Sequence, residues 1–146
     1  MGKSLFISAL GLDIGRKRIG VAGCDGTGLI ATGLTTILRR SFTHDIAQFQ
    51  DLVEHRQVQL LVAGLPYHLD GSLGSQAKYT QNYAQRLAHG LNLPLEYVDE
   101  RLTSYQAEQL MIADNISLSR NKSMIDRKAA ALILQQWLDQ RRQGNG

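Results

Sequence analysis

Cysteine, proline and long hydrophobic runs are scarce in this sequence of 146 residues. The single cysteine, Cys24, excludes an internal disulfide and any CxxC zinc or redox motif, and it fits a reducing compartment such as the cytoplasm. Two prolines exclude a proline-rich linker protein. No stretch approaches the roughly 18 apolar residues of a membrane span, and no signal-peptide cleavage site follows the apolar residues 5–12. We therefore expect a globular protein with no membrane partner.

The length is that of one ordinary domain, and no internal repeat or shift in composition divides the chain. We expect a single domain over residues 1–146, with a core over about residues 5–140 and a loose C-terminal tail from about Gln140. The formal net charge of +3 permits a polyanionic partner but does not require one.

The apolar pattern predicts an α/β fold. Runs at residues 5–12, 19–24 and 29–38 predict a three-strand antiparallel meander, with a turn at Asp25-Gly26. Helical spacing and short apolar runs then predict helices over 43–56 (capped by Thr43), 75–91, 103–114 and 125–140, and strands over 59–63 and 95–98. Right-handed crossovers would make the first, fourth and fifth strands parallel, with their carboxyl ends at one edge.

Acidic residues from three distant segments could meet at that edge. Asp13 lies at the end of the first strand, and Asp99 and Glu100 lie at the end of the fifth. Because side chains alternate along a strand, only one of Asp99 and Glu100 can face the same side as Asp13. Asp126 lies in the apolar stripe of the last helix, within about 40° of Ala130 on a wheel of about 100° per residue.

Each of these acids has an ordinary structural explanation when taken singly, as a turn, cap or first-turn residue. Together they predict a site for hard cations, because Mg²⁺ is held by carboxylates and substrate phosphates. Basic residues lie beside the same positions: Arg16–Arg18 after Asp13, Arg101 after Glu100, and Lys122 on a polar loop over residues 115–123. Such cations would receive phosphates that the acids alone would repel.

Four motifs then resemble those of the YqgF/RuvX family, in the ribonuclease H-like superfamily. They are residues 12–22 (Leu-Asp-Ile-Gly-Arg-Lys-Arg-Ile-Gly-Val-Ala), Gly64-Leu65-Pro66 with Asp70-Gly71, residues 99–104, and Asn121-Lys122 with Asp126 and the alanine run 129–131. The resemblance covers about residues 5–140. The last motif departs from the family pattern, because Arg127-Lys128 stands where many members have a small residue after the aspartate.

The resemblance implies a ribonuclease H-like fold, with a mixed five-stranded sheet in the order 3-2-1-4-5, strand 2 antiparallel, and flanking helices. It also implies that Asp13, Glu100 and Asp126 form a catalytic triad that binds one or two Mg²⁺ or Mn²⁺ ions, which favours Glu100 over Asp99. We expect the substrate backbone to be bound by Arg16, Lys17, Arg101 and Lys122.

The function predicted on this basis is hydrolysis of phosphodiester bonds in structured nucleic acid, in the processing of the 5′ end of pre-16S rRNA. One alternative is a DNA endonuclease that resolves Holliday junctions, and another is a nucleic-acid or ribosome-associated binding module with a vestigial triad. An actin-like ATPase would need two such lobes, and 146 residues supply one. A monomer and a homodimer both remain open.

Overall fold

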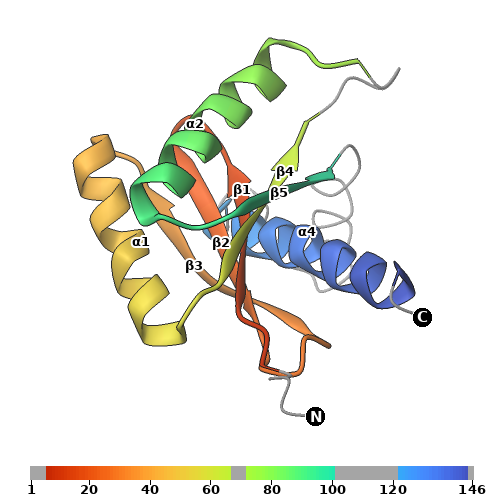
Figure 1. Ribbon diagram of the computed structural model, residues 1–146. Helices are drawn as coiled ribbons and strands as arrows, with labels where there is room; N and C mark the ends of the chain where they lie inside the picture. Colours follow the sequence, from red (N-terminus) through yellow and green to blue (C-terminus); the bar gives the residue numbers. More distant parts are fainter. Residues whose placement is uncertain (1–5, 67–71, 101–121, 145–146) are drawn as a thin grey trace.

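A mixed five-stranded sheet, in the order β3-β2-β1-β4-β5, forms the centre of the computed structural model (Figure 1). The structure describes residues 6–66, 72–100 and 122–144. The antiparallel meander consists of β1 (Ala9–Ile14), β2 (Arg18–Cys24) and β3 (Ala31–Leu38). β4 (Leu60–Leu65) pairs parallel to β1, and β5 (Leu95–Asp99) pairs parallel to β4. The predicted α/β class, the strand order and the parallel arrangement of β1, β4 and β5 are therefore confirmed.

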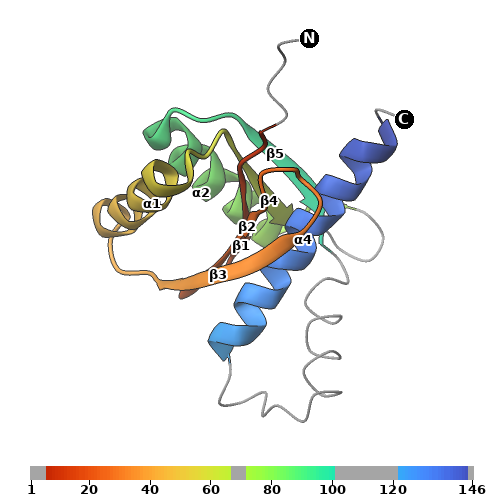
Figure 2. The same ribbon diagram turned by 90° about the horizontal axis from the view of Figure 1, so that it is seen from below.

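Two helices cover one face of the sheet and a third crosses the other (Figure 2). Helix α2 (Ser75–Leu91) has the predicted bounds, whereas α1 (Phe42–Arg56) begins before the expected cap Thr43. That cap prediction was wrong, because the Ser41 side chain accepts a hydrogen bond from the His44 backbone N–H. The helix expected over residues 103–114 lies outside the described residues. None of the helices in the described ranges is long and apolar enough to cross a membrane.

The last helix, α4 (Lys122–Gly144), is longer at both ends than the predicted segment 125–140. The expectation of a loose tail from Gln140 was wrong for the residues up to Gly144. The Arg142 guanidinium donates to the Gly28 carbonyl (2.9 Å), and the Gln135 amide donates to the Leu29 carbonyl (2.9 Å). These bonds to the turn between β2 and β3 explain why the helix continues.

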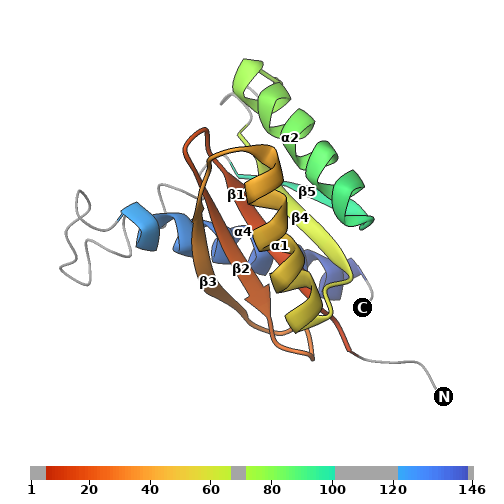
Figure 3. The ribbon, with the colours of Figure 1, turned by 90° about the vertical axis from the view of Figure 1, so that its left-hand side faces the viewer.

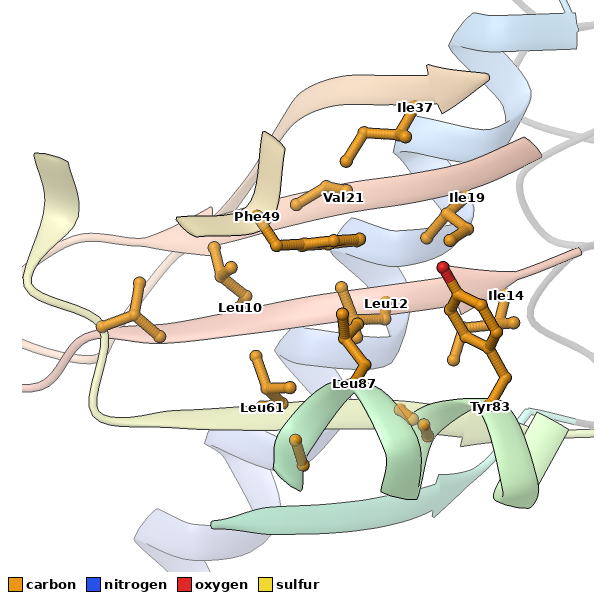
Figure 4. Packing of buried hydrophobic residues seen from close by; sticks show 14 residues of the cluster. Leu10, Leu12, Ile14, Ile19, Val21, Ile37, Phe49, Leu61, Tyr83 and Leu87 are labelled. Atoms are coloured by element: carbon orange, nitrogen blue, oxygen red, sulfur yellow. The ribbon is translucent and has the colours of Figure 1, made fainter. Parts of the chain in front are cut away.

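The two faces of the sheet carry side chains of different size. Helices α1 and α2 lie over one face of the sheet (Figure 3). On that face, large residues such as Leu10, Leu12 and Val21 pack against Phe49 of α1 and Leu87 of α2 (Figure 4). On the α4 side the strands carry mostly small residues, including Ala9, Gly11, Gly20, Ala22 and Gly64. A Cβ added at Gly11 would lie 2.6 Å from the Leu134 Cβ, so these small residues let α4 approach the sheet closely.

Candidate functional site

Two of the predicted acids lie on neighbouring parts of the sheet edge. Asp13 is the next-to-last residue of β1, and Glu100 follows β5, where its backbone N–H donates to the Leu65 carbonyl (3.1 Å). Strand alternation explains why Glu100 rather than Asp99 joins Asp13. Glu100 has the same parity as Val98, which packs with α4, and its carboxylate lies against Gly64 on that side.

The third acid, Asp126, is brought to this edge by α4. The helix buries Ala130, Ile133 and Leu134 against the sheet, as the predicted apolar stripe requires. At its N-terminal half, the Asp126 backbone lies so near β2 that a Cβ at Gly20 would overlap the Asp126 carbonyl oxygen. Glycine in β2 therefore sets how closely Asp126 approaches the acids on the strands.

Asp13 and Glu100 act electrostatically as a pair. Burial, and next the Asp126 charge, raise the pKa of Asp13 to about 6, while a hydrogen bond from Glu100 and the Arg18 charge act in the lowering direction. Burial, and next the Asp13 charge, raise the pKa of Glu100 to about 8. Burial and the closeness of the two carboxyl groups therefore both favour a proton on this pair in the metal-free protein.

Asp126 has a different partner, which our sequence analysis treated only as part of a basic run. The Arg18 Nε lies 2.6 Å from the Asp126 Oδ2, a short charge-assisted hydrogen bond. The signal that could have found this pair is alternation in β2: Arg18 has the parity of Gly20 and Ala22, which face α4.

The four residues predicted to bind substrate differ in their surroundings. Lys17 and Lys122 are exposed. Lys122 is the first residue of α4, so its expected position on a loop was wrong. The Arg16 guanidinium stacks on the Tyr79 ring of α2, 4.2 Å from its centroid. Arg101 lies outside the described residues.

A second arginine missed by the sequence analysis holds the turn that carries these cations. The Arg39 guanidinium donates to the Gly15 carbonyl (2.8 Å) and to the Tyr79 hydroxyl (2.6 Å), and its backbone N–H donates to the Lys17 carbonyl (2.9 Å). Its charge is balanced by the buried Asp45 of α1, 3.8 Å away. The turn between β1 and β2 is thereby fixed to both helices on the other face.

The chemistry of the acids fits a divalent cation in part. Glu100 Oε2 is buried without a hydrogen-bond partner, and it lies beside Asp13, so these two carboxylates offer oxygen ligands of the kind Mg²⁺ uses. Within residues 6–66, 72–100 and 122–144, however, no group of three Asp, Glu, His or Cys side chains is arranged to hold an ion. Asp126, the third acid, is paired with Arg18.

The sequence is similar to one protein family and to relatives that share one name. A model of the family described as RuvX, Holliday junction resolvase, matches residues 7–140. A Trichormus variabilis protein named "Putative pre-16S rRNA nuclease" is 69% identical over 137 residues, covering 94% of this chain and 91% of the relative. A protein of the same name from Microcystis aeruginosa is 62% identical over 139 residues, covering 95% and 96%.

The fold has a counterpart among solved structures. Thermus thermophilus RuvC, solved in complex with a Holliday junction substrate, superposes with a TM-score of 0.58 at 15% identity, covering 94% of this chain and 96% of RuvC. At that identity the likeness establishes the fold alone. It agrees with the predicted fold, a mixed five-stranded sheet in the order 3-2-1-4-5 with flanking helices.

Proposed function

The chain belongs to the RuvX family, and from this premise we propose that it is a metal-dependent endonuclease whose substrate is the precursor of 16S rRNA. The observation that carries the proposal is the convergence of Asp13, Glu100 and Asp126 from β1, β5 and α4 at one edge of the sheet. The name of the relatives at 62–69% identity supports the choice of RNA substrate.

In this proposal, Asp13 and Glu100 hold Mg²⁺ or Mn²⁺, with Asp126 as a further ligand. Such a cation supplies Lewis acidity, generates a nucleophile from water at neutral pH and stabilises the leaving oxygen of a phosphodiester. The low exposure of the carboxylates keeps their charge effective at short range. The pair formed by Asp13 and Glu100 must release its shared proton before both can act as ligands, because metal ligands are deprotonated.

The surrounding cations would bind the nucleic-acid backbone. Lys17 and Lys122 are exposed and lie within a few residues of Asp13 and Asp126 in the sequence, so we assign them to the phosphates of the substrate. We assign the same role to Arg101 from its place directly after Glu100 in the sequence. Arg16 would have to leave the Tyr79 ring to join them. A precursor-rRNA substrate and a lone buried cysteine both favour action in the cytoplasm.

The test is cleavage of two labelled substrates side by side: a 5′-extended 16S rRNA fragment and a four-way DNA junction. Each is incubated with the full chain, with Mg²⁺ or Mn²⁺ or with chelator, and with Asp13→Asn as the matched inactive control. We expect metal-dependent cleavage of the RNA that Asp13→Asn loses. Cleavage of the junction alone would establish the resolvase alternative, which the family description favours. Binding without cleavage of either would establish a binding module.

A further inference from the structure

Arg18 is positioned as a cation that belongs to the acidic site itself. Its Nε lies 2.6 Å from the Asp126 Oδ2, while the Arg18 side chain is 31% exposed and that of Asp126 only 16%. Breaking such a pair leaves a largely buried carboxylate without a counter-charge, which is costly. The Arg18 charge also reaches Asp13, where it favours the ionised carboxylate. One guanidinium thus interacts with two of the three acids.

The backbone of Arg18 is fixed, whereas its side chain has room to move. Its carbonyl accepts a hydrogen bond from the Gly15 N–H (2.9 Å), and the residue pairs with Leu38 of β3. These contacts hold the Cα at the start of β2, facing α4. A long side chain that is nearly one-third exposed can exchange partners through rotamer changes alone.

The pairing with Arg18 occupies a carboxylate oxygen that a metal site would need. Glu100 Oε2 is buried without a partner beside Asp13, yet no three acidic side chains of the described ranges form a set that could hold an ion. Asp126 carries the third carboxylate, and its Oδ2 is the atom that Arg18 engages. Arg18 and a divalent cation would therefore compete for the same oxygen.

We infer that Arg18 is a resident counter-ion: it pairs with Asp126 in the metal-free protein and must release that carboxylate before a divalent cation is fully ligated. The pairing keeps α4 and the strand acids assembled without metal, and it weakens metal binding as a consequence. The inference rests on the proposed metal-dependent function. The opposite possibility, that Arg18 orients Asp126 for the metal, predicts a change of opposite sign.

The test is titration of the full-length protein with Mn²⁺ by isothermal calorimetry, together with thermal unfolding in chelator. Three proteins are compared: wild type, Arg18→Met, and Lys17→Met, which removes the neighbouring exposed charge as a matched control. We expect Arg18→Met to bind Mn²⁺ about tenfold more tightly, which corresponds to about 1.4 kcal/mol, and to melt at a lower temperature in chelator. Lys17→Met should stay within about twofold of the wild-type Kd, because general charge effects on an exposed lysine are screened.

The outcomes separate this inference from the function on which it rests. If wild type binds Mn²⁺ and Arg18→Met binds it equally or more weakly, the counter-ion role is overturned while the metal site stands. An equal gain in Lys17→Met would also overturn it, since the effect would then not depend on contact with Asp126. If neither wild type nor Arg18→Met binds Mn²⁺, both the metal site and the counter-ion role fall.

A second variant covers the case in which Arg18→Met does not fold in chelator. Arg18→Lys keeps the charge but lacks the Nε that contacts Asp126. We expect its affinity for Mn²⁺ to exceed that of wild type by a smaller factor, about threefold. An affinity equal to or below that of wild type would overturn the competition.

Discussion

Replacing Glu100 by glutamine should stabilise the metal-free protein near neutral pH. Burial and the Asp13 charge raise the pKa of Glu100 from 4.5 to about 8, so the folded protein keeps a proton that the unfolded chain releases. The folded state is therefore disfavoured progressively as pH rises above the unfolded pKa, and this loss levels off above the folded pKa. Glutamine is neutral at every pH and can still donate a hydrogen bond to Asp13.

The size of the effect follows from the gap between the two pKa values. Each pH unit between them costs about 1.4 kcal/mol, and pH 7 lies about 2.5 units above 4.5, so Glu100 lowers the free energy of unfolding by about 3 kcal/mol there. For a domain of this length, each kcal/mol shifts the melting temperature by roughly 3 °C. Glu100→Gln should therefore melt roughly 5–10 °C above wild type at pH 7, and the difference should shrink toward pH 5.

The assay is thermal unfolding in chelator at about pH 5, 6 and 7, followed by circular dichroism. Glu54→Gln provides the matched control, because Glu54 is exposed on α1 and should follow wild type at each pH. A Glu100→Gln protein that melts at or below wild type at pH 7, or a difference independent of pH, would refute the reasoning. It would mean that the charged Glu100 is stabilised inside the fold.

Three further outcomes are expected. Asp13→Asn and Asp126→Asn should each abolish most cleavage of the precursor RNA in gel assays, and a rate within about tenfold of wild type, about 1.4 kcal/mol of barrier, would remove the role from that residue. Lys122→Ala should lower the slope of log affinity against log salt by about 0.7–0.9 in fluorescence titrations, whereas an unchanged slope would make Lys122 a solvated surface residue. Gly20→Ala should lower the free energy of unfolding in urea by about 1–3 kcal/mol or more, because the alanine Cβ would meet the Asp126 backbone. A neutral effect would contradict the close approach of α4.

The fold could be predicted from the sequence because its main signals are local. Alternating and continuous apolar runs fix the type of each element, and the turn at Asp25-Gly26 fixes the hairpin of β2 and β3. Right-handed crossovers then leave few ways to place β4 and β5. The errors arose at ends of elements, where Ser41 took the cap expected of Thr43 and Arg142 extended α4. Such ends depend on hydrogen bonds that local periodicity does not encode.

The candidate site could be predicted in part. The placement of Asp13 and Glu100 follows from the carboxyl ends of parallel strands, and that of Asp126 follows from the inward stripe of a helix. Residue patterns alone left Asp99 and Glu100 as alternatives, and the family resemblance favoured Glu100. In the structure Glu100 lies beside Gly64 and Asp13, while its role as a ligand stays a prediction.

Only the tertiary structure decided how the charges pair. Arg16, Lys17 and Arg18 are equivalent in the sequence, yet one stacks on Tyr79, one is exposed and one binds Asp126. These differences depend on the crossing of α4 over the small residues of the sheet and on the direction of each side chain in a tight hairpin. The sequence thus determined which charges gather at this edge, and three-dimensional packing determined their partners, because ion pairs form over a few ångströms between residues far apart in the chain.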